Sequence, residues 1–254
     1  MIGAMRKGTT LRGALIGLVV MAGLAAPGAG AEESCAECTH TRAYDTARSF
    51  GAEPKRGIIL HLHACGGLDL ASGGWQAAWL DYLTASGFLV IAMDSFADKR
   101  PPAVCPGNEK ATPTLKNLIF SHRIQQIEYA VKKIREHHPG RPLFLWGHAE
   151  GGRAATMITA DIDGIVSTGA ACPDEWLDGI ADKPLLVIQG NDDPNLQGAK
   201  ANPLYGSLEG RCQMQMTDPK WQWLIVDGMR EAAALERDAI KARLAKFLGI
   251  PAAP

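Results

Sequence analysis

The segment Arg141-Pro142-Leu143-Phe144-Leu145-Trp146-Gly147-His148-Ala149-Glu150-Gly151-Gly152-Arg153-Ala154 decides how this chain is interpreted. Residues 143–146 form a short apolar run of the length expected for a buried strand. Gly147 and Gly151 bound a sharp turn, and a helix is expected to begin directly after it. A turn of this kind lifts one side chain clear of the sheet, and here it is the side chain at position 149.

The two glycines match the motif G-x-S-x-G, a nucleophile elbow, in which the central residue attacks the substrate. The central residue is serine, or cysteine in some proteins, but in this chain it is Ala149. A methyl group can neither be deprotonated nor attack a carbonyl carbon. The sequence therefore predicts the turn without its reactive atom.

The first 31 residues have the pattern of a secretory signal peptide. Basic residues precede an apolar run over 13–26, and Ala29-Gly30-Ala31 is a cleavage site of the A-x-A type. A retained membrane anchor is the alternative, but the run is shorter than the about 20 residues that span a bilayer. We therefore expect cleavage near Ala31, a secreted or periplasmic protein, and no membrane contact after cleavage.

Size and charge limit the possible functions of the mature chain. Cleavage removes 31 of the 254 residues and leaves 223, enough for one α/β domain. Of the 26 basic residues 3 are removed, so 23 remain against 27 acidic ones, a net charge of −4. A weakly acidic chain without a clustered basic face is not expected to bind nucleic acid.

Six cysteines follow the signal peptide, and export makes them disulfide candidates: Cys35, Cys38, Cys65, Cys105, Cys172 and Cys212. The pair Cys35 and Cys38 lacks the βαβ frame of a redox pair, and the histidine of a haem site does not directly follow it. A disulfide, local or to the body of the domain, is the preferred interpretation. The segment 32–56 around this pair is expected to be an irregular lead-in.

Apolar runs of strand length alternate with helical patterns through the rest of the chain. Strands are predicted at 57–62, 88–93, 143–146, 165–169, 184–189 and 221–226, helices at 75–86, around 120–134, after the turn and at 232–248, and a surface loop at 97–113. Such alternation predicts an α/β fold with a mostly parallel sheet covered on both faces. His63, Asp94, Ala149, Cys172 and Asp193 each follow a strand, so we expect them on one rim of the sheet.

With these elements placed, the chain resembles the α/β-hydrolase fold, and within it the dienelactone-hydrolase-like family, from about Gly57 to Leu248. The likeness rests on the loop 61–67, the strand and Asp-Ser-Phe end at 88–96, the elbow at 147–152, and the strand and turn at 187–193. It implies one hydrolase domain over 57–254. His61 and His63 alternate on one strand without a companion ligand, so no metal site is expected, and no cofactor is expected either. Cys65 and Cys105 are expected to form one disulfide, and Cys172 and Cys212 a second.

The resemblance also assigns roles to single residues. Asp193 takes the place of the triad acid, with Asp192 as the runner-up, although Asn-Asp-Asp-Pro is also ordinary turn chemistry. The triad histidine should follow the last strand, where Glu231 stands instead; all seven histidines lie at or before position 148. The backbone amides of Ala64, Cys65 and Glu150 take the place of the oxyanion hole.

Two functions from different classes remain open. The first is a degenerate hydrolase that binds a partner or a small ligand with a carbonyl or carboxylate group. The second is a carboxylic-ester or lactone hydrolase, either inactivated on purpose at Ala149 or using another nucleophile and base, such as the thiol of Cys65. An engineered alanine would leave the triad histidine in place, so the missing histidine favours the first.

Overall fold

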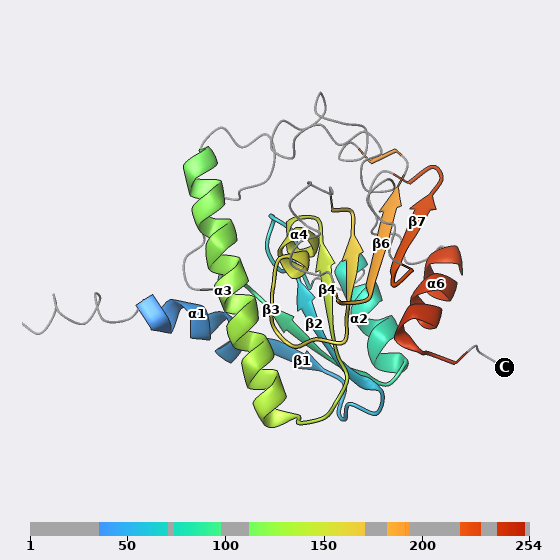
Figure 1. Ribbon diagram of the computed structural model, residues 1–254, viewed down its shortest axis with the longest axis horizontal. Coiled ribbons are helices and arrows are strands. Elements are labelled where there is room, and N and C mark those ends of the chain that lie inside the picture. The colour runs from blue at the N-terminus through green and yellow to red at the C-terminus, as the bar shows by residue number, and fades with distance from the viewer. Residues whose placement is uncertain are drawn as a thin grey trace, which may run out of the picture. The chain divides into compact units, whose positions relative to one another are not determined.

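A seven-stranded sheet in the order β1-β3-β2-β4-β5-β6-β7 forms the centre of the fold (Figure 1). The computed structural model describes residues 36–70, 74–97, 112–170, 182–190, 192–193, 219–229 and 238–251. The strands are β1 (Arg48–Phe50), β2 (Gly57–Leu62), β3 (Phe88–Met93), β4 (Leu143–His148), β5 (Gly164–Thr168), β6 (Leu185–Gly190) and β7 (Trp221–Val226). The helices are α1 (Ala36–Asp45), α2 (Trp75–Ala85), α3 (Pro113–His137), α4 (Glu150–Thr156) and α6 (Asp238–Leu248).

All neighbouring strands run parallel except β1, which pairs antiparallel with β3. Every residue of β2, β3 and β6 is buried, as expected for parallel strands covered by helices on both faces. The expected α/β fold with a mostly parallel sheet is therefore confirmed.

Alternate residues of each strand contribute to two separate hydrophobic cores. Leu60, Leu145 and Val187 belong to the core that α1, α3 and α4 cover. Ile59, Trp146 and Ile188 belong to the core that α2 and α6 cover. This alternation follows from the two-residue period of a strand, which turns successive side chains to opposite faces.

All six predicted strands are present, with ends that differ by at most two residues. The helices predicted at 75–86 and around 120–134 are α2 and α3, and the one after the turn is α4. The predicted closing helix 232–248 is α6 where the structure describes it, from Asp238 onward. Most of the predicted loop 97–113 lies outside the described residues.

The expectation of an irregular lead-in at 32–56 is wrong for residues 36–50. Helix α1 packs on α3 through Ala43, which is 2% exposed, and the rings of Tyr44 and Tyr129 meet edge to face at 6.2 Å. Strand β1 then pairs with the outer edge of β3, with Ser49 opposite Ile91. Both elements depend on partners far along the chain, so the local polar composition gave no sign of them.

Within the described ranges, no helix combines the length and apolar character that crossing a membrane would require. The signal-peptide expectation concerns residues 1–31, which lie outside these ranges.

Candidate active site of a hydrolase fold

Ala149 stands between the end of β4 and the start of α4 with φ 48° and ψ −114°. It is the one non-glycine residue with positive φ among those the structure describes. Such a conformation costs about 1–3 kcal/mol and persists only where surrounding contacts enforce it. Here the Ala149 N–H donates to the carbonyl of Thr168 at 2.8 Å, and the Arg153 N–H donates to the carbonyl of Ala149 at 3.0 Å.

The glycines on either side allow the strand, turn and helix to pack closely. A Cβ atom on Gly147 would overlap the backbone oxygen of Gly151, and one on Gly151 would overlap the backbone oxygens of Leu62 and His63. The chain therefore forms the close-packed strand–turn–helix of an elbow, with a methyl group at its apex.

His63, in the loop after β2, joins this loop to the end of β3. Its Nδ1 lies 2.6 Å from the carbonyl oxygen of Ala64, which can only accept, so Nδ1 carries the proton. Its Nε2 lies 2.9 Å from the backbone nitrogen of Ser95 and accepts from that N–H. Burial, followed by the nearby charge of Arg123, lowers the pKa of His63 well below its ordinary value. His63 is therefore neutral, and its 3.5 Å approach to Asp94 is not an ion pair.

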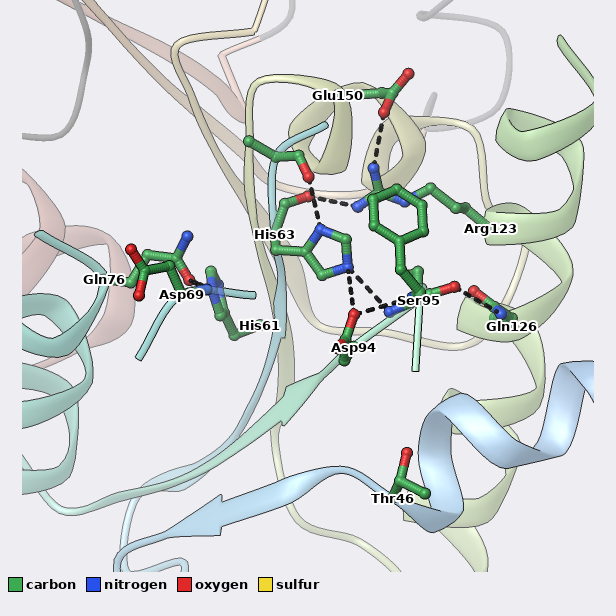
Figure 2. A network of polar contacts seen from close by, with 12 residues as sticks. Thr46, His61, His63, Asp69, Gln76, Asp94, Ser95, Arg123, Gln126 and Glu150 are labelled. Atoms are coloured by element: carbon green, nitrogen blue, oxygen red, sulfur yellow. Dashed lines mark hydrogen bonds and ion pairs between the residues drawn. The ribbon is translucent and has the colours of Figure 1, made fainter. Parts of the chain in front are cut away.

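Arg123 of α3 connects the elbow to the loop after β2 (Figure 2). Its Nη1 lies 2.9 Å from Oε2 of Glu150, its Nη2 donates to the backbone oxygen of His63, and its guanidinium lies 5.7 Å from the centre of the Phe96 ring. The side chain of Arg123 is 1% exposed and that of Glu150 is 10% exposed. Two charges so far from water are tolerated because they pair with each other and with backbone groups.

Asp193 occupies the position expected for the acid. It is buried after the end of β6, two strands along the sheet from β4, and its Oδ2 accepts from Nε2 of Gln189 at 2.6 Å. Asp192, the alternative, is exposed, and its N–H donates to the carbonyl of Met229 at 3.1 Å. A buried, oriented carboxylate is what an acid position requires, and of the two residues only Asp193 is buried.

His148 and His61 lie on the opposite face of the sheet from Arg123 and pack against aromatic rings. The ring centre of His148 lies 4.3 Å from that of Trp75, and His61 stacks on Trp146 at 4.1 Å. Nδ1 of His148 lies 3.1 Å from Oγ1 of Thr168. Burial lowers the pKa of each of these two histidines to about 4. Both are neutral side chains of the core near neutral pH.

Several expected site residues cannot be placed. Glu231 lies outside the described residues, as do Cys35, Cys105, Cys172 and Cys212, and the side chain of Cys38 is also undescribed. The structure has Cys65 in a disulfide, so this residue offers no thiol as a substitute nucleophile. The partner of Cys65 stays a prediction. No group of three or more His, Cys, Asp or Glu side chains within the described ranges is arranged to hold a metal ion.

Arg123 and Gln189 were not among the residues expected at the site. Arg123 could have been identified from the sequence, because it interrupts the apolar face of α3 three residues after Phe120 and four before Ile127. A charged residue on the buried face of a helix requires a buried partner. Gln189 gave no such signal, since its role depends on the turn that brings Asp193 back toward it.

A cavity of about 790 Å³ is lined by residues 51–53, 55–56 and 84–88. It lies at the amino ends of β2 and β3, whereas ligands of open α/β sheets bind at the carboxyl ends of the strands. This cavity is therefore separate from the site around Ala149, despite its size.

The sheet order, the covering helices and the elbow define an α/β-hydrolase fold. No family model matches the sequence, and no curated protein matches it. Solved structures do match. The protein TT1662 from Thermus thermophilus has a TM-score of 0.57 and 16% identity, covering 79% of this chain and 92% of that one.

A dienelactone hydrolase from Anabaena variabilis has a TM-score of 0.55 and 16% identity over 80% of this chain and 96% of its own. A dienelactone hydrolase-like promiscuous phosphotriesterase from metagenomic libraries has a TM-score of 0.53 and 15% identity over 79% and 86% of the two chains. At such low identity these similarities establish the shared fold.

The buried histidines predict how stability depends on pH. The folded-state pKa values of His61 and His148, about 4, lie below the ordinary value of 6.5, so the unfolded chain binds more protons. Stability is therefore fully present above pH 6.5 and is lost as the pH falls toward 4. We expect each histidine to account for a loss of about 2 kcal/mol between pH 7.5 and pH 5.

Urea unfolding at the two pH values measures this loss. His148→Asn should shrink the difference between them, whereas His137→Asn, at an exposed histidine of α3, should leave it unchanged. Equal pH dependence in all three proteins would contradict the assignment.

The Arg123–Glu150 pair predicts a large effect of removing one partner. Arg123→Met leaves the carboxylate of Glu150 buried without its cation, so we expect the free energy of unfolding to fall by about 3–5 kcal/mol. Lys133→Met is the matched control, because Lys133 pairs with Glu136 at 2.8 Å on the surface, where water screens the pair, and its loss should change stability far less. Urea unfolding distinguishes the two variants. Equal losses in the free energy of unfolding would show that the buried pair stabilises the fold no more than the surface pair does.

Proposed function

We propose that this protein is an exported, dienelactone-hydrolase-like member of the α/β-hydrolase fold that has lost catalysis and binds a small ligand above Ala149. The observation that carries the proposal is the residue at the apex of the elbow. Ala149 keeps the strained φ of 48° that presents a nucleophile, yet its side chain is a methyl group. A site that keeps its geometry without its reactive atom is suited to binding.

The ligand chemistry follows from the donors around the elbow. The N–H of Glu150 opens α4, and the first N–H groups of a helix have no partner within the helix. With the backbone amides of Ala64 and Cys65 it would hold a carbonyl or carboxylate oxygen. A carboxylate-bearing small molecule is therefore the proposed ligand, and secretion or transfer to the periplasm rests on the signal-peptide pattern of residues 1–31.

The sequence supports the loss of catalysis beyond the single alanine. No histidine follows position 148, so no imidazole comes after Asp193 to act as the base. The described histidines of the elbow region, His61, His63 and His148, are buried among other partners. Restoring the hydroxyl should therefore not restore the reaction.

Ala149→Ser tests this directly with p-nitrophenyl butyrate as the substrate. We expect turnover by the serine variant to stay within about tenfold of the unaltered protein, because a general base contributes about 10²-fold or more and no histidine follows Asp193 to act as one. Near-ultraviolet circular dichroism serves as the folding control. Turnover more than about 10²-fold above the unaltered protein, lost again in Ala149→Ser combined with Asp193→Asn, would overturn the proposal and favour an ester hydrolase.

A matched pair of substitutions tests the binding site. Ala149→Asp places a negative charge at the apex, and Ala149→Asn places a neutral side chain of the same size there; both residues tolerate positive φ better than most. Isothermal titration with butyrate should show binding that weakens at least about tenfold in the aspartate variant relative to the asparagine variant, through like-charge repulsion. Butyrate that binds neither the unaltered protein nor the asparagine variant would contradict a carboxylate site.

A further inference from the structure

A second cavity lies at the carboxyl ends of the strands, on the side of the sheet nearest β1. It measures about 430 Å³ and is lined, among the described residues, by Thr46, Arg48, Leu68, Leu70, Asp94 and Ala97. These residues come from the turn after α1, the first residue of β1, the loop after β2 and the segment after β3. Since β2 separates β3 from β4, and neighbouring strands lie about 4.8 Å apart, the cavity lies about 10 Å from the elbow strand.

The lining carries one cation and one anion that do not pair with each other. Arg48 is exposed on β1, where its backbone pairs with β3, and no hydrogen bond or ion pair joins its side chain to another residue in the described ranges. Arg48 therefore lines the cavity with a guanidinium that no described residue pairs with.

Within the described ranges, no lysine or arginine pairs with Asp94. Its side chain is 36% exposed, and Oδ1 accepts from the N–H of Phe96 at 2.9 Å. Figure 2 shows its neighbour His63 with Nε2 directed at Asp94 and Ser95. Because Nε2 accepts from the Ser95 N–H at 2.9 Å, it has no proton to give to Asp94. The carboxylate is therefore available to a positively charged group in the cavity.

The remaining walls are partly apolar. Leu68 and Leu70 are half-buried in the loop after β2, and Leu70 packs on the core below. The hydroxyl of Thr46 donates to the carbonyl of Arg42 at 2.8 Å, so it presents lone pairs rather than its proton. Figure 2 labels Thr46 on the turn after α1 and Asp94 at the end of β3, and both line the cavity. The cavity thus offers a cation, an anion and an aliphatic wall.

We propose that this cavity binds a free aliphatic α-amino acid. The guanidinium of Arg48 pairs with the carboxylate, which arginine recognises with two parallel hydrogen bonds. Asp94 accepts from the ammonium group, and Leu68 and Leu70 contact the aliphatic side chain. The volume lies in the range of small-molecule sites. The site does not involve Ala149, so it is independent of the function proposed above.

L-leucine is the probe, titrated calorimetrically into the intact protein. Leucinamide lacks the carboxylate, and 4-methylpentanoate lacks the ammonium group. We expect leucine to bind and each analogue to bind at least about tenfold more weakly, because each leaves one charge of the cavity unpaired. Binding of 4-methylpentanoate as tight as that of leucine, or no binding of leucine at millimolar concentration, overturns the proposal.

Substitutions locate the site. Arg48→Gln and Asp94→Asn should each weaken leucine binding about tenfold or more, while Arg243→Gln, the same change on α6, should have no effect. Saturating butyrate should leave the affinity for leucine unchanged, which separates this site from the one above Ala149. Urea unfolding of both single variants and of the double variant is the second measurement. Non-additive losses of stability without leucine binding would show that the two residues pair with each other instead.

Discussion

The contact between Arg123 and Glu150 is the interaction on which the rest of the site depends. The guanidinium of Arg123 contacts the first residue of α4 and the backbone oxygen of His63 in the loop after β2, and it packs on Phe96 after β3. Three strand ends are thereby fixed to one side chain of α3. The elbow thus keeps its strained backbone through packing and a buried charge pair, neither of which requires a nucleophile at position 149.

Most of the sheet could be predicted from the sequence because its signals are local. The strand Phe88–Met93 is an unbroken apolar run, and Gly147 and Gly151 mark the elbow at fixed spacing. Strand β1 and helix α1 could not be predicted, because Arg48–Phe50 extends only through its pairing with β3, and α1 through its packing on α3. Their stability comes from partners about 40 and 80 residues further along the chain.

Some features of the site could likewise be predicted from the sequence, and others could not. The missing hydroxyl at Ala149 and the missing late histidine are facts of the sequence, whereas the preference for Asp193 over Asp192 required the burial of one and the exposure of the other. The tautomer of His63 depends on two backbone groups, the carbonyl of Ala64 and the N–H of Ser95, and contacts with backbone groups cannot be inferred from composition. Arg123 was visible as an anomaly on an apolar helix face, but its partner was not.

Strand β1 also affects how the molecule meets other chains. Without it, the six-residue β3 would present a row of unpaired backbone groups at the outer edge of the sheet, ready to pair with a strand from a neighbouring molecule. The strand that covers this edge is three residues long, runs antiparallel and begins with an exposed arginine. A short, charged outer strand is a poor template for further pairing. Strand β1, which could not be predicted from the sequence, therefore protects this edge of the sheet against aggregation.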